Sequence, residues 1–121
     1  MLIRNITRNT EFEVQVADIF FQHIFGLMFS KPKDLLFKFS SNKVRSFWMF
    51  GVSYNINIAF VSESGEVFHV EEAKPLTFYP KTWKTYESVK PCKYVLETAK
   101  NLVQPGDILK TYEFFKTRKA I

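Results

Sequence analysis

The sequence predicts an α+β fold that is rich in β-structure, with a compact, mostly antiparallel sheet or partial barrel and one main N-terminal helix packed on it. Several short stretches alternate apolar and polar residues, as half-buried strands do. One segment, residues 18–28, has the broad apolar face of a helix. The turns between these segments are short, and 121 residues suit a single domain spanning residues 1–121.

The N-terminal part supplies one strand and the helix. Phe12, Val14 and Val16 alternate with polar residues, which predicts a strand with one face on the core. Asp18 can cap a following helix by accepting a hydrogen bond from a free backbone N–H group. The apolar face of that helix consists of Ile19, Phe20, Phe21, Ile24, Phe25 and Leu27.

The middle of the chain changes character along its length. Residues 35–39, "LLFKF", read as a strand, and "SSNK" separates them from "SFWMFGVSYNINIAFV" at residues 46–61. The apolar run at residues 47–50 needs cover on both faces, and the predicted helix is expected to provide the second cover. The alternative is a ligand or partner that completes this cover. From Tyr54 to Phe60 the alternation predicts a sheet with one face in water.

The second half predicts further strands joined by short turns. Gly65 can adopt a positive φ in the hairpin loop at residues 63–66, and the next strand returns from Val67. Residues 73–91 show neither period and predict a long ordered loop. "KYVLET" and "DILKTYEFF" read as strands on either side of a turn at residues 104–107. Such short connections favour antiparallel pairing.

An ordered set of short motifs resembles the bacterial and archaeal family called domain of unknown function 192. The motifs are "GLM" (26–28), "LLFKF" (35–39), "FWM" (47–49), "NIAFV" (57–61), the Gly65 turn, "YVLE" (94–97) and "GD" (106–107). The resemblance covers about residues 10–110. It implies a single compact α+β or barrel-like β domain and brings no established activity with it.

Several polar positions of that family are replaced in this chain. Gln22 and His23 stand where a Glu-Arg pair is usual, and residues 50–52, Phe-Gly-Val, replace Lys-Asn-Thr. Asn57 stands where the family usually has Asp. Any chemistry that depends on those groups is therefore in doubt for this protein.

Composition limits the class of protein and its partners. Seventeen Lys and Arg against twelve Asp and Glu give a net charge of +5, which favours anionic partners, although lysine also serves solubility and thermal stability. Cys92 is the only cysteine, so neither an intramolecular disulfide nor a cysteine metal cage can form within one chain. No apolar run has the length of a signal peptide or a membrane span. We therefore expect a cytoplasmic protein without membrane association, cofactor or metal.

The most suggestive segment for function is residues 74–94, in which lysines alternate with aromatic residues. Lysines neutralise phosphates and exposed aromatic rings stack on unpaired bases, so this segment predicts binding of single-stranded nucleic acid or another anionic ligand. The alternative is a loop held by its aromatic residues, with its lysines simply in water. The basic tail at residues 116–121 extends the surface or is merely solvated. The candidate ligand-binding residues are Lys74, Lys81, Trp83, Lys84, Tyr86, Lys90 and Lys93.

Two other functions compete with a binding module. A small hydrolase-like or ligand-processing enzyme would use Glu72, Glu97 and Asp107 with His69, since paired carboxyl groups in an apolar cleft can act as acid and base. The same residues also suit ordinary turns and strand ends. Two histidines are too few for a zinc site, and Cys92 has no evident base beside it. A protein-interaction or oligomerisation domain is the third interpretation, because 17% of the residues are aromatic.

Overall fold

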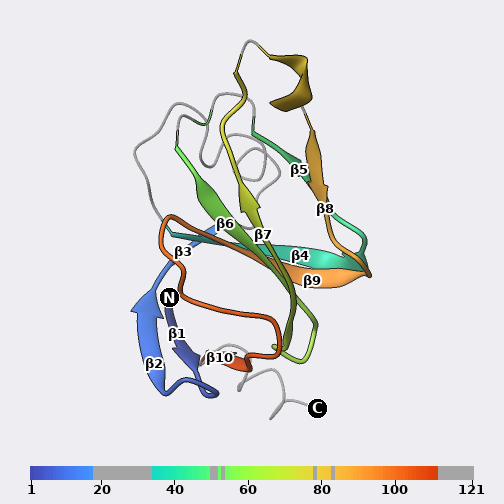
Figure 1. Ribbon diagram of the computed structural model, residues 1–121. Helices are drawn as coiled ribbons and strands as arrows, with labels where there is room; N and C mark the ends of the chain where they lie inside the picture. Colours follow the sequence, from blue (N-terminus) through green and yellow to red (C-terminus); the bar gives the residue numbers. More distant parts are fainter. Residues whose placement is uncertain (18–33, 50–51, 53, 78, 83, 112–121) are drawn as a thin grey trace.

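The computed structural model describes residues 1–17, 34–49, 52, 54–77, 79–82 and 84–111. These residues form three open sheets (Figure 1). The central sheet has five strands in the order β3-β4-β9-β6-β7. Its strands are β3 (Gln15–Ala17), β4 (Leu35–Lys43), β9 (Cys92–Thr98), β6 (Ile56–Val61) and β7 (Val67–Ala73).

Two smaller sheets complete the described structure. One has the order β10-β1-β2, with β10 (Leu109–Thr111), β1 (Leu2–Asn5) and β2 (Thr10–Glu13). The other pairs β5 (Ser46–Trp48) with β8 (Thr85–Glu87), and the 3₁₀ turn η1 (Pro80–Thr82) precedes β8. Neighbouring strands are antiparallel as predicted, except that β3 runs parallel to β4.

The central sheet is buried on both faces. Ile58 and Phe60 belong to an apolar cluster shared with Met49 and Tyr86 of the β5–β8 region. The other face carries a second cluster of ten buried residues, which includes Ile3 and Leu109 of the three-stranded sheet. Figure 1 accordingly shows the two small sheets on opposite sides of the central one. The prediction that residues 54–60 leave one face in water was wrong, because Ala59 and Val61 pack into the second cluster.

The predicted α+β class, with a main N-terminal helix on a sheet or partial barrel, was also wrong. The described residues contain no α-helix, only the turn η1, and their sheets are open. Residues 18–28, on which the helix was predicted, lie outside the described residues. Strand β8 lies within the segment predicted as a loop and pairs with β5, and its Tyr86 belongs to the same apolar cluster as Met49. No helix in the described part of the chain is long and apolar enough to cross a membrane.

The turns follow the sequence more closely than the strand boundaries do. Gly65 has a φ of 94°, which confirms the predicted hairpin loop, and Gly106 in the turn before β10 has the same value. Strand β4 continues through "SSNK" to Lys43, with a register irregularity after Lys38. The predicted strand at residues 12–16 is divided between β2 and β3. Strand β1 has no counterpart among the predicted elements.

Replacing Gly106 with alanine is expected to lower the free energy of unfolding by about 1 kcal/mol. A Cβ at this position would meet no atom within 4 Å, so the cost comes from the φ of +94° alone. Gly106→Asn is the matched variant and should lose less, because asparagine tolerates positive φ better than alanine. Urea denaturation measures both, and equal stability of G106A and the wild type would contradict this origin of the cost.

Candidate functional site

The three candidate catalytic carboxyl groups do not meet. Glu97 on β9 and Glu71 on β7 both lie opposite Ile58 of β6, so they share one face of the sheet. Glu72 is the next residue along β7, is exposed, and therefore lies on the other face. Asp107 lies outside the sheet, in the turn before β10. The structure thus brings together no acid and base pair from Glu72, Glu97 and Asp107.

Glu97 is the most perturbed of these groups. Its position on β9 lies between Leu35 and Ile58 in the strand register, and only 4% of the residue is exposed. Burial raises the pKa of this carboxyl group to about 8, so it is mostly protonated at pH 7. Desolvation by burial is the cause of this shift. A neutral acid inside an apolar cluster explains the residue without a substrate.

Asp107 is the centre of a hydrogen-bond network. One carboxylate oxygen, Oδ2, accepts hydrogen bonds from Asn5 Nδ2 at 2.8 Å, Arg8 Nε at 2.8 Å and the backbone N–H of Gln104 at 2.9 Å. Burial raises the pKa of Asp107, but the hydrogen bonds and the Arg8 charge outweigh burial and lower it overall. The side chain is 2% exposed. It connects the turn after β1 to the turn before β10 and has a structural role.

His69 pairs with the neighbouring carboxylate on β7. Its Nε2 lies 2.9 Å from Glu71 Oε1, and its ring centroid lies 5.0 Å from that of Phe60. Nδ1 is buried and has no hydrogen-bond partner among the described residues. No group of three or more metal-ligating side chains occurs within the described part of the chain. The pair therefore forms no metal site with other described residues.

Cys92 is a buried structural thiol. The residue has no exposed surface, and burial raises its pKa despite a hydrogen bond with Ser88 and the nearby Arg45 charge. A thiol with a raised pKa that is closed to solvent is a poor nucleophile. The structure therefore offers no support for a reactive cysteine at this position.

The lysines around η1 form the first of two basic groups. Lys74, Lys81 and Lys84 are exposed, and with Tyr79 they are called the η1-end cluster. Tyr79 is 69% exposed, and Lys81 Nζ lies 6.0 Å from the centre of its ring. The side chain of Lys84 lies over Tyr86, with Nζ 4.8 Å from the ring centre.

Tyr86 supports this cluster from below. The residue is only 5% exposed, and its hydroxyl group accepts a hydrogen bond of 3.2 Å from the backbone N–H of Lys74. Its ring is therefore part of the core and is not available to stack on a base. Trp83, the other aromatic candidate on this segment, lies outside the described residues.

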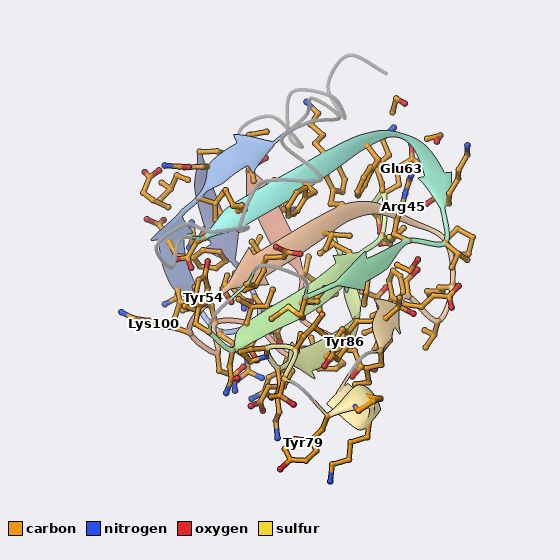
Figure 2. The ribbon with its side chains drawn as sticks, turned by 90° about the horizontal axis from the view of Figure 1, so that it is seen from above. Arg45, Tyr54, Glu63, Tyr79, Tyr86 and Lys100 are labelled. Atoms are coloured by element: carbon orange, nitrogen blue, oxygen red, sulfur yellow. The ribbon has the colours of Figure 1, made fainter. Side chains whose placement is uncertain are left out.

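The second basic group lies at the opposite end of β8. Lys90 Nζ lies 4.7 Å from the centre of the Phe68 ring, and Lys93 Nζ lies 3.5 Å from the carbonyl oxygen of Ser40. Lys43 at the end of β4 and Arg45 in the β4–β5 turn are two further cationic residues. The turn-end cluster is defined as Lys43, Arg45, Lys90 and Lys93. Figure 2 shows Arg45, Tyr86 and Tyr79 following one side of the molecule, with Lys100 on the other.

Sequence reasoning missed Lys43 and Arg45. They lie more than forty residues before Lys90, and the pairing of β5 with β8 brings them together. The backbone N–H of Ser88 donates to the carbonyl oxygen of Arg45 at 2.9 Å, which continues that pairing. If a short turn joined β5 and β8, a hairpin pattern in the sequence would have indicated that Lys43 and Arg45 lie near Lys90, but these two strands are far apart in the chain. Only the register places the residues side by side.

The fold defines a class of small β-rich domains with a five-stranded central sheet between two smaller sheets. Within that class the chain belongs to the domain of unknown function 192 family, described as "Uncharacterized ACR", whose model matches residues 2–110. This confirms the resemblance carried by the ordered motifs. The matched range includes β1, which the sequence interpretation had left out.

The comparisons with individual proteins agree with this assignment. The UPF0127 protein PF1050 of Pyrococcus furiosus is 27% identical over 104 residues, covering 83% of this chain and 84% of that protein. A solved protein of unknown function from Novosphingobium aromaticivorans is similar with a TM-score of 0.76 and 20% identity, over 91% of this chain and 83% of that one. A "putative transcription regulator" from Sinorhizobium meliloti has a TM-score of 0.73 and 24% identity, over 90% and 91%. At these identities the two structures show the shared fold alone.

Proposed function

We propose that the protein is a non-enzymatic binding module for single-stranded nucleic acid. The observation that carries the proposal is the placement of exposed lysines at both ends of β8: Lys74, Lys81 and Lys84 at one end and Lys90 at the other. Lysines that are held over aromatic rings keep their charges at the surface, where phosphates can reach them. The net charge of +5 adds a weak general attraction for anions.

The two clusters suit a short single strand. Lys84 and Lys90 are six residues apart, so their backbones are separated by at most roughly 20 Å. A chain of a few nucleotides spans such a distance, and single-strand binding sites of this kind contact several nucleotides at once. Lys93 lies beyond Lys90 and belongs to the same end of the proposed path.

Aromatic stacking supplies the second part of the proposed interaction. Tyr79 is 69% exposed beside Lys81, and its ring is proposed to stack on an unpaired base. Stacking of this kind contributes about 1–3 kcal/mol per base. Trp83 is proposed as a further stacking residue on the basis of its place in the sequence. Tyr86 supports the cluster from the core and has no direct contact in this proposal.

The comparisons are consistent with this proposal at a general level. The Sinorhizobium meliloti protein is described as a "putative transcription regulator", and a nucleic-acid partner for this chain is compatible with that description. The carboxyl groups of the competing enzyme hypothesis lie apart, with only Glu72 exposed, which favours a binding module over catalysis by Glu72, Glu97 and Asp107.

Removing two lysines of the η1-end cluster is expected to weaken binding. In fluorescence anisotropy at low salt, K81A/K84A should bind labelled fifteen-nucleotide poly(dT) roughly ten times more weakly than the wild type. The slope of log K against log salt should fall by about 1.4, because each lost phosphate contact in a single strand contributes about 0.7. Lys100→Ala, on the other side of the molecule, is the matched control and should leave affinity unchanged. Absence of wild-type binding to both DNA and RNA strands would eliminate the proposal.

A further inference from the structure

Arg45 is fixed in place by its neighbours. Its Nη2 donates hydrogen bonds to the carbonyl oxygen of Ser41 at 2.6 Å and to Ser41 Oγ at 3.3 Å. The guanidinium carbon lies 3.9 Å from the centre of the Phe39 ring. Its backbone N–H also donates to Ser88 Oγ at 3.0 Å. An arginine held in this way loses little conformational entropy when it binds a ligand.

Part of the hydrogen-bonding capacity of this guanidinium group is unused. Nε is buried without a hydrogen-bond partner, and Nη1 donates no hydrogen bond to any residue that the structure describes. Nor does any described carboxylate lie within ion-pair distance of Arg45. A partly buried arginine without an acidic partner is unusual. Because Nε is buried, Nη1 is the donor of this group that an added acceptor can reach.

The surroundings of Arg45 favour an anion as that acceptor. Lys43 is the last residue of β4, Lys90 lies in the turn before β9 and Lys93 is the second residue of β9. Glu87, exposed on β8 and opposite Ser46 in the register, is the acidic residue nearest to Arg45 in that pairing. The strand register therefore brings four cationic residues onto neighbouring stretches of backbone, together with the acidic residue Glu87.

An apolar edge borders the same cluster. The pairing of Ser46 with Glu87 and of Arg45 with Ser88 places Val44 beside Val89 when the register is continued by one residue. Val44 is 47% exposed and Val89 is 72% exposed. Exposed apolar side chains next to a phosphate contact suit the sugar or base of the same nucleotide.

We infer that the turn-end cluster is a phosphate-binding subsite, in which Arg45 binds one phosphate of a phosphodiester chain and Lys43, Lys90 and Lys93 neutralise its neighbours. This inference rests on the proposed function and extends it. It adds a second element, the β4–β5 turn, to the path along β8, and assigns its central contact to a planar guanidinium group, which matches phosphate oxygens better than a lysine ammonium does.

The test compares Arg45 variants with two anionic chains. The probes are labelled ten-nucleotide poly(dT) and a linear inorganic polyphosphate of similar charge. Arg45→Ala should bind poly(dT) roughly ten times more weakly and reduce the salt slope by about 0.7, the value for one phosphate contact. Arg45→Lys should restore the slope while recovering only part of the affinity. If Arg45 had a purely structural role, its variants would lose stability in urea, but Arg45→Lys would not restore the salt slope while leaving the affinity for poly(dT) reduced.

The control variants keep the result interpretable if Arg45→Ala fails to fold. Lys43→Ala with Lys90→Ala leaves Arg45 in place and should lower the slope by about 1.4. Lys100→Ala should bind like the wild type. Wild-type binding of poly(dT) with no effect of the Arg45 and Lys43/Lys90 variants would overturn the subsite, and nucleic-acid binding would then rest on the η1-end cluster that K81A/K84A tests. Binding of polyphosphate alone, lost in R45A, would support the subsite and overturn the nucleic-acid function; binding of neither chain would overturn both.

Discussion

Glu97→Gln is expected to raise the free energy of unfolding at pH 8 by roughly 4 kcal/mol, the largest effect of any single substitution considered for this chain. Burial raises the pKa of this carboxyl group from 4.5 to about 8. Unfolding at pH 8 releases it into water, where it ionises freely, and this favours the unfolded state. Glutamine has nearly the same shape and never ionises, so the variant avoids the penalty.

The sign of the pH dependence follows from proton binding. Between pH 4.5 and about 8 the folded state retains the Glu97 proton, while the unfolded state has lost it. The stabilising effect of the neutral acid is complete below pH 4.5 and decreases as the pH rises through about 8. Stability should therefore fall by up to roughly 1.4 kcal/mol per pH unit across this interval.

Urea denaturation at pH 5 and pH 8 measures this effect. The wild type and E97Q should have similar stability at pH 5 and separate progressively as the pH rises. Glu72→Gln is the matched control, since this exposed residue lies on the other face of the sheet, and its curve should follow that of the wild type. Parallel curves for the wild type and E97Q would show that Glu97 does not hold a proton in the folded state.

Asp107→Ala is expected to destabilise the protein by roughly 3 kcal/mol at pH 7. The substitution removes an acceptor shared by Asn5, Arg8 and the backbone of Gln104. Asn5 has no exposed surface, so its amide would be left buried without this acceptor. The turn after β1 would also lose its direct connection to the turn before β10.

The Asp107 effect should depend on pH in the opposite direction to that of Glu97. Because the folded pKa is below the ordinary value of 3.8, this carboxylate stabilises the fold above that value and stops doing so as the pH falls through its folded pKa. The difference between D107A and the wild type should thus shrink below about pH 4. Arg8→Ala is the comparison, and it should cost about 1 kcal/mol or less because Arg8 is 41% exposed. A deficit that stays constant from pH 7 to pH 3 would contradict this account.

The sequence by itself identified the family, the β-rich character and the turns. The ordered motifs from "LLFKF" to "GD" led to the family that the match over residues 2–110 confirms. The Gly65 hairpin was also predictable, because glycine adopts the positive φ that a short turn requires without a steric penalty. These features depend on neighbouring residues, which a sequence displays directly.

The tertiary structure alone decided which surfaces meet. The all-apolar run around Met49 indicated burial on two sides but gave no sign that its cover includes β8, because strands can pair across any sequence distance. Alternation in β6 predicted a solvent-exposed face. Ala59 and Val61 are instead covered by the three-stranded sheet β10-β1-β2, whose strands come from both ends of the described chain. The turn-end cluster is of the same kind: Arg45 meets the basic segment through strand register, which local sequence patterns do not encode.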